Sequence, residues 1–437
     1  SSSSSSSGGS LRSRASKNGA AAAVAAGTPI AFQDGSSLLQ STLNLLKNII
    51  GSGMLSLPAG VAAFSNDPRA VVPASAATLL MAALSAYGFV LLGDVCSTTG
   101  EKTYQGAWSK AVSKSTSFIP AIACTSKAAI ACVAFAMIMG DCLSMVLGCS
   151  RRTAIVGLAS TVLFPLCRLK SLKPLSKFSA IGVASNFYVC FFILLRYLDG
   201  TYAVASPVQK LSSATLSGSV WGLAVNPGFI TMASILSTSY LAHYNAPTFY
   251  DQLAADSNGS KDARFRLMSM VGFGLAGLAF CLLLCGGFWT FGEASSGLIL
   301  NNYAPDDRLA ILARLAMVVG MVTGYPLTFM GLRNQCVAMM GDAGKRLQEE
   351  SSMALTAGLL TLLTAAAVSL KDLGKLVAIA GACFGSFLIY IAPALMVLGS
   401  KRKGLRPRGS VGGTVLQHLM VPLGLCLGIS GVLQALR

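Results

Sequence analysis

Apolar runs of about 20 residues, each long enough to cross a hydrocarbon core roughly 30 Å thick, dominate this chain of 437 residues. A spanning segment must satisfy its own backbone hydrogen bonds, and runs of this length do so as helices. The sequence therefore predicts an all-α multipass membrane protein with about 11 transmembrane helices. The expected spans are 39–64, 71–96, 118–148, 153–167, 178–198, 226–250, 267–291, 308–331, 352–370, 374–398 and 413–436.

Composition excludes other classes of protein. Hydrophobic residues make up 53% of the chain, charged residues only 11%, and the mean hydropathy is +0.65, too apolar for a soluble globule. The net charge of +17 comes from short basic clusters between spans, so we expect contact with the lipid bilayer and no nucleic-acid partner. The twelve cysteines are scattered without a CxxC pair, which predicts small buried side chains and no metal site.

The chain divides into an N-terminal tail, 1–36, and a transmembrane domain, 37–437. The tail is rich in Ser, Gly and Ala and lacks the apolar stretch of a signal peptide, so we expect it to be disordered and cytosolic. Because the first residue is Ser, the sequence does not establish that the N-terminus is complete.

The distribution of basic residues predicts the orientation. With a cytosolic tail, 21 of the 33 Lys and Arg residues fall in the tail and the inside loops, against 8 on the opposite side when Arg308 and Lys375, at the ends of their spans, are counted there; this is the positive-inside pattern. The densest cluster is KRKGLRPR at 401–408, expected to face lipid headgroups. The sequon at Asn258 lies in an expected inside loop, and a glycan there would invert the topology.

Two spans contain features that break a helix, which a bilayer tolerates only where protein covers the backbone or a cavity meets it. The first span reads NLLKNIIGSGMLSLP from Asn44, and Gly51-Ser52-Gly53 interrupts it between Asn48 and Pro58. The glycines are spaced GxG, which does not place them one turn apart as a GxxxG packing face would. We therefore expect a broken helix.

The sixth span carries a run of four hydroxyl side chains, Ser237, Thr238, Ser239 and Tyr240, followed by His243. One Ser or Thr in a span often bonds back to its own helix, but four together with a histidine favour a second break. The first and sixth spans correspond if 39–198 and 226–398 are inverted repeats of five helices, with 413–436 as an extra helix.

A broken span suits a zwitterion. The exposed N–H groups of one half-helix attract a carboxylate, and the exposed carbonyls of another attract an ammonium. We expect the carboxylate at Gly51, Ser52 and Gly53, near Asn48 and Ile50. The ammonium is expected at the second break, near the carbonyls of Ser237, Thr238, Ser239 and Tyr240, with His243 beside them.

Five segments resemble the amino acid/auxin permease family, whose animal members include sodium-coupled neutral and proton-coupled amino acid transporters. They lie in the family's order between residues 38 and 398. They are NLLKNIIGSGMLSLPAG in the first span, MIMGD (137–141), AHYNAPTFYDQL (242–253), FWTFGEASSGLILNNY (288–303) and DLGKLVAIAGACFGSFLIYIAPALM (372–396).

The resemblance implies the LeuT-type 5+5 inverted-repeat fold and secondary active transport of amino acids, expected to be neutral. Sodium-coupled members commonly have Asn where this chain has Lys47, and hydroxyl ligands where it has Val322 and Gly324; Thr323 is the nearest hydroxyl. An ammonium would repel a sodium ion, so proton coupling or facilitated transport is favoured. Sodium coupling and an amino acid sensor stay as alternatives.

The coupling-ion candidates are Lys47, Thr323 and Asp141. Lys47 has two interpretations left open: it snorkels to the cytoplasmic interface, or its ammonium occupies the vacant sodium position. We expect no enzyme activity, no cofactor beyond the ion gradient and no obligate protein partner. The membrane is expected to be the plasma membrane or that of a vacuole or lysosome, and the sequence does not choose between them.

Overall fold

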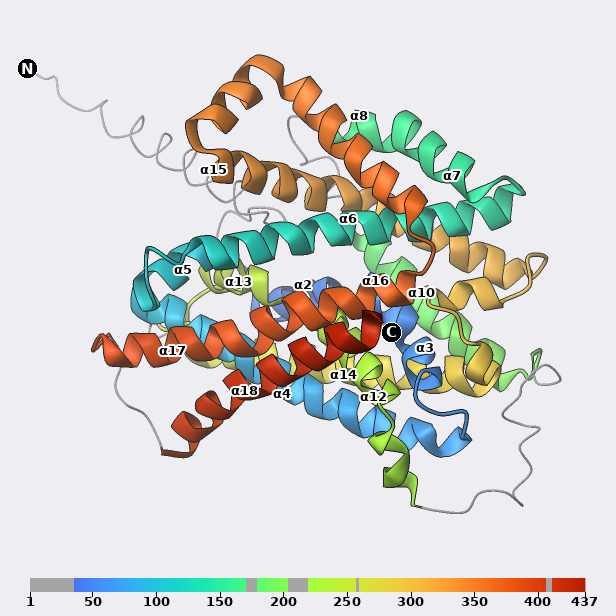
Figure 1. Ribbon diagram of the computed structural model, residues 1–437, viewed down its shortest axis with the longest axis horizontal. Helices are drawn as coiled ribbons and strands as arrows, with labels where there is room; N and C mark the ends of the chain where they lie inside the picture. The colour runs from blue at the N-terminus through green and yellow to red at the C-terminus, as the bar shows by residue number, and fades with distance from the viewer. Residues whose placement is uncertain (1–34, 170–178, 203–218, 257–258, 406–410, 437) are drawn as a thin grey trace, which may run out of the picture.

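The computed structural model describes residues 35–169, 179–202, 219–256, 259–405 and 411–436 as a bundle of helices (Figure 1). Its longer helices are α4 (Val71–Thr99), α6 (Phe118–Leu147), α10 (Ser179–Leu198), α14 (Asp262–Phe291), α15 (Arg308–Ser369), and α18 (Val411–Leu436). The shorter ones are α2 (Leu38–Ile49), η1 (Ser52–Ser56), α3 (Leu57–Ala62), η2 (Pro68–Ala70), α5 (Tyr104–Ala111), α7 (Arg151–Leu158), η3 (Ala159–Leu163), α8 (Phe164–Cys167), η6 (Val220–Val225), α12 (Gly228–Ser239), η7 (His243–Asn245), α13 (Ala246–Gln252), η8 (Gly292–Ala294), η9 (Ile299–Asn302), α16 (Leu373–Ala380), η10 (Gly381–Ile391) and α17 (Ala392–Arg402).

The prediction of an all-α multipass membrane protein is confirmed. Six described helices are long and apolar enough to cross a membrane, and α2 with the segment Ser52–Ala62 forms a seventh candidate that is bent by 43°. The expected spans at 153–167, 178–198 and 226–250 are helical in their described parts, but they are short or interrupted. The count of eleven therefore stays a prediction.

Two expected spans, 308–331 and 352–370, are joined within α15. At about 1.5 Å per residue, its 62 residues are far too long for one crossing. The backbone leaves helical geometry at Gly341 (φ 62°, ψ −132°) and Ser351 (φ −142°, ψ 42°), and Figure 1 shows the chain bending there and running back. The connection expected as a loop, 332–351, is thus largely helical.

The packing places the two interrupted segments inside the bundle. α6 packs against α15 and α14 packs against α4, while α12 contacts η1, α3 and η10. The buried core continues through the interrupted segments, where Met54, Leu55, Leu236 and Tyr240 are almost fully buried. Protein therefore covers the backbone where the helices break, as a low-dielectric surrounding requires.

The last two residues of the expected tail lie within the described chain. Ser36 forms an isolated parallel bridge with Leu253, and its N–H donates to the Gln252 carbonyl at 2.8 Å. This contact ties the start of the described chain to the end of α13. The rest of the tail, the loop at 170–178, the sequon residue Asn258 and part of the basic cluster, 406–408, lie outside the described residues.

Candidate functional site

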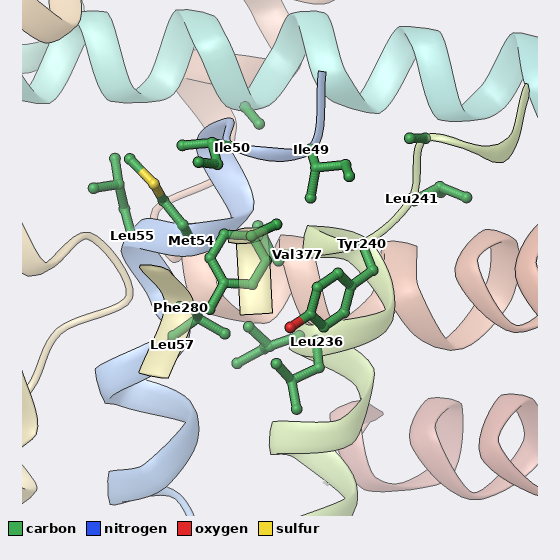
Figure 2. Packing of buried hydrophobic residues seen from close by; sticks show 14 of the residues in the cluster. Ile49, Ile50, Met54, Leu55, Leu57, Leu236, Tyr240, Leu241, Phe280 and Val377 are labelled. Atoms are coloured by element: carbon green, nitrogen blue, oxygen red, sulfur yellow. The ribbon is translucent and has the colours of Figure 1, made fainter. Parts of the chain in front are cut away.

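The first break lies at Ile50 and Gly51, between α2 and η1 (Figure 2). Met54 N–H makes the first hydrogen bond of the new helix, to the Gly51 carbonyl at 3.4 Å. The N–H groups of Gly51, Ser52 and Gly53 come before that bond and have no helical acceptor. The break therefore presents three backbone donors at the positive end of a helix.

The carbonyl on the other side of this break is occupied. Asn186 on α10 donates its Nδ2 to the Ile50 carbonyl at 2.6 Å, which satisfies the group that the end of α2 leaves without a helical donor. The first break is thus fixed on its acceptor side and open on its donor side.

The second break lies between α12, which ends at Ser239, and α13, which begins at Ala246. Beyond Ser239 the chain makes short-range bonds, from Leu241 N–H to the Thr238 carbonyl at 3.2 Å and from Ala242 N–H to the Tyr240 carbonyl at 2.9 Å. The structure therefore shows both breaks that the sequence predicts.

The two breaks touch each other at Gly53 and Ser239. A Cβ on Gly53 would lie 2.7 Å from Ser239 Oγ and 3.0 Å from Ser239 Cα, closer than atoms pack. A Cβ on Gly51 would have its nearest neighbour, the Ile49 carbonyl oxygen, at 4.0 Å. Gly53 is therefore required for helix packing, while Gly51 borders open space.

A cavity of about 520 Å³ adjoins this contact, a size suited to a small molecule. From the first break it extends past Asn44 and Lys47 toward Gln252 and Gln335. Its lining includes eight residues expected at the site from the sequence: Lys47, Asn48, Ile50, Gly51, Ser52, Gly53, Thr238 and Ser239.

The opposite side of the break is closed by apolar packing. Figure 2 shows Met54, Leu57 and Phe280 packed near Tyr240, and each of these side chains is fully buried. Ser56 Oγ also donates to the Gly297 carbonyl at 2.6 Å. The cavity therefore extends from the break toward one face of the molecule, the face where α2 begins and α13 ends.

Three expected site residues lie outside the cavity lining. Ser237 Oγ donates to the Ala233 carbonyl at 3.0 Å, within its own helix. The Tyr240 hydroxyl donates to the Thr78 carbonyl on α4 at 3.1 Å. These side chains bond within helix α12 and to α4, rather than facing the cavity.

His243, the third, is also buried, and it packs against Phe89 and Phe273. Its Nε2 lies 2.9 Å from the Ser85 carbonyl oxygen. Since a carbonyl can only accept, Nε2 carries the proton and donates it. The imidazole thus joins the second break to α4.

Two of the three coupling candidates also lie elsewhere. Thr323 Oγ1 donates to the Gly320 carbonyl of its own helix at 2.8 Å. Asp141 forms an ion pair with Arg151, whose guanidinium also donates to the Ala367 carbonyl at 3.1 Å. Lys47 is the candidate that lines the cavity.

The structure adds polar residues that the sequence did not assign to the site. Asn186, Asn245 and Gln335 line the cavity, as does Lys127, whose ammonium lies 3.7 Å from the centre of the Tyr244 ring. Outside this lining, Arg314 donates to three carbonyls, those of Leu300, Tyr303 and Ala304.

Two asparagines at the breaks have unused hydrogen-bonding capacity. Asn48 Oδ1 lies 3.4 Å from both the Tyr244 hydroxyl and Asn245 Nδ2. Asn48 Nδ2 and Asn245 Oδ1 are buried and lack a partner within the described structure. This unpaired donor and acceptor lie beside the cavity and could bind a polar ligand. A buried donor or acceptor that forms no hydrogen bond costs free energy, and a ligand that pairs with it removes that cost.

The chain is similar to known proteins over most of its length. The family model described as "Transmembrane amino acid transporter protein" matches residues 34–437. Vacuolar amino acid transporter 2 of Saccharomyces cerevisiae is 21% identical over 85% of this chain and 79% of its own length. Human solute carrier family 38 member 8 is 25% identical over 84% of this chain and 85% of its own length. Sodium-coupled neutral amino acid transporter 7 of Danio rerio is 22% identical over 84% of this chain and 80% of its own length.

Among solved structures, MhsT in complex with L-phenylalanine covers 93% of this chain and 100% of its own, with a TM-score of 0.52 and 11% identity. This neighbour has the LeuT-type fold, which confirms the expected fold class. The family match confirms the resemblance found in the sequence motifs. The chain therefore belongs to the transmembrane amino acid transporter protein family.

Proposed function

We propose that this protein is a secondary active transporter of amino acids that binds its substrate between the two broken helices. The observation that carries the proposal is the cavity beside Gly51, Ser52 and Gly53, where three backbone N–H groups lack helical acceptors. These donors suit the α-carboxylate, as half-helix ends do in transporters of this architecture. The carbonyl end of α12, at Thr238 and Ser239, suits the ammonium.

The shape of the cavity supports an inward-facing state. The apolar packing around Met54 and Phe280 closes one side of the breaks, and the cavity extends toward Gln252, beside the start of the described chain. With a cytosolic N-terminus, as the positive-inside pattern predicts, this face meets the cytosol. Transport would then require opening the Met54 side while closing the Gln252 side.

A proton gradient, or facilitated diffusion without coupling, fits the cavity better than sodium coupling. Sodium requires several oxygen ligands without a neighbouring positive charge. Here Lys47 lines the cavity, and the Thr323 hydroxyl bonds within its own helix. The membrane in which the protein works is proposed to be the plasma membrane or that of a vacuole or lysosome, since relatives include vacuolar transporters.

Purified protein in liposomes tests this function. Uptake of a panel of labelled amino acids is measured under an imposed proton gradient, an imposed sodium gradient and neither. We expect uptake that follows the proton gradient or needs no gradient. Uptake driven by sodium alone would overturn the coupling proposal, and binding without flux would favour an amino acid sensor.

A further inference from the structure

The cavity wall is positively charged. Lys47 and Lys127 both line it, and none of the described residues in its lining is Asp or Glu. Ionisable groups within a membrane domain are costly and generally serve substrate or ion pathways. The charge of the wall therefore disfavours a substrate with a cationic side chain and favours one with an additional anionic group.

Lys127 differs from three lysines of the described chain that form ion pairs. Lys102, Lys110 and Lys345 pair with Asp251, Glu101 and Asp342, at distances of 2.9, 2.8 and 3.3 Å. Within the same described residues, Lys127 forms no ion pair with a carboxylate. Its ammonium lies over the face of the Tyr244 ring, 3.7 Å from the ring centre.

The contact with Tyr244 positions the Lys127 ammonium but gives its N–H donors no oxygen acceptor. A cation held over an aromatic face is attracted by the ring, yet a lysine ammonium has three N–H donors, and an aromatic face is no substitute for a carboxylate. An oxygen anion entering the cavity can accept from these donors in charge-assisted hydrogen bonds.

Tyr244 also places Lys127 near the first break. Its ring carries the ammonium on one face, while its hydroxyl lies 3.4 Å from Asn48 Oδ1. Asn48 precedes Gly51 by three residues on the same segment. The Tyr244 side chain therefore links Lys127 to Asn48, which lies just before the backbone donors of Gly51, Ser52 and Gly53.

We propose that Lys127 binds a side-chain carboxylate of the substrate, so that the cavity prefers acidic amino acids to their amides. The inference rests on the proposed function: the α-carboxylate occupies the donors at Gly51, Ser52 and Gly53, and the second carboxylate meets Lys127. It departs from the neutral substrate class expected from the sequence.

Competition between matched pairs tests the inference in the unmodified protein. Glutamate is compared with glutamine, and aspartate with asparagine, as inhibitors of labelled uptake in liposomes. The members of a pair differ little in size, so their ratio reports the charge. One charge-assisted contact predicts that the acid competes roughly tenfold or more better in at least one pair.

Variants at Lys127 then assign the preference to this residue. Lys127→Gln is expected to lower the acid-to-amide ratio by roughly tenfold, while Lys127→Arg keeps the charge and most of the ratio. Lys375→Gln is the matched control, because Lys375 is exposed and does not line the cavity. Its ratio should equal that of the unmodified protein.

The outcomes separate this inference from the proposed function. Equal competition by acids and amides, or a ratio that Lys127→Gln leaves unchanged, overturns the inference while transport itself stands. Absence of flux for every amino acid overturns the proposed function instead. If Lys127→Gln does not fold, Tyr244→Leu replaces it, because this change removes the ring that positions the ammonium. Tyr244→Leu should lower the acid-to-amide ratio, and an unchanged ratio overturns the inference.

Discussion

The two broken helices use their polar groups differently. At the first break, Gly51, Ser52 and Gly53, whose backbone N–H groups lack helical acceptors, line the cavity together with the flanking Lys47 and Asn48. At the second, Tyr240 and His243 are buried and bond to carbonyls of α4. A polar side chain near a break can thus serve either the ligand or the packing, and the partner it meets decides which.

The largest expected effect comes from Gly53→Ala. The added Cβ would lie 2.7 Å from Ser239 Oγ. This clash should push the two breaks apart and lower the free energy of unfolding by about 1–3 kcal/mol, the range for overpacked sites. We expect uptake to fall below detection in liposomes, with a lower thermal midpoint for the purified protein. Gly51→Ala is the control for stability only, since its added Cβ would have its nearest neighbour at 4.0 Å, and its thermal midpoint should equal or exceed that of the unmodified protein.

Uptake by Gly53→Ala at the level of the unmodified protein would show that the contact between the breaks is dispensable. The reverse order, with Gly51→Ala the more damaging, would indicate that ligand access at Gly51 matters more than packing at Gly53.

A second effect is expected from Lys47→Asn, which removes one of two positive charges in the cavity lining. If the ammonium occupies the ion position, accumulation driven by a proton gradient should fall by roughly tenfold, the size of one interaction of about 1.4 kcal/mol. Accumulation at several imposed gradients measures this. Unchanged accumulation would favour a lysine that snorkels to the interface.

His243→Phe tests whether the second break is structural. The change removes the hydrogen bond to Ser85 and leaves a buried carbonyl without that donor, at a cost of about 1–3 kcal/mol. We expect a lower thermal midpoint but an unchanged dependence of uptake on the proton gradient, per molecule of folded protein. Loss of the proton dependence with full stability would assign His243 to coupling.

The smallest effect is expected from Thr238→Val. Its hydroxyl donates to the Val377 carbonyl at 2.6 Å, which joins α12 to α16. The loss should cost about 1 kcal/mol and raise the KM for uptake modestly, because Thr238 also lines the cavity. A loss of uptake as large as that of Gly53→Ala would mean that the Thr238 side chain binds the substrate itself.

Much of the fold could be predicted from the sequence. Apolar runs give membrane helices, and the Gly51-Ser52-Gly53 triplet gives the first break, because the energetic reasons for both are local. The sequence predicts the connection within α15 less well. Apolar runs mark the two spans 308–331 and 352–370, but they do not show that the polar stretch between them, 332–351, is largely helical.

The site could be predicted only in part. The backbone donors follow from the break itself, so Gly51, Ser52 and Gly53 are found from the sequence. The surroundings do not follow, because Asn186, Lys127 and Gln335 come from three helices far apart along the chain. No local pattern marks these residues as neighbours of the first break.

Hydrophobic length and helix-breaking residues act locally, so the multipass helical architecture and the interruptions of the first and sixth expected spans follow from the sequence. Which polar residues line the cavity depends instead on tertiary packing. Side-chain direction depends on the neighbour that each helix face meets, which is why His243 turns toward α4 and Lys127 lies over Tyr244 beside the first break.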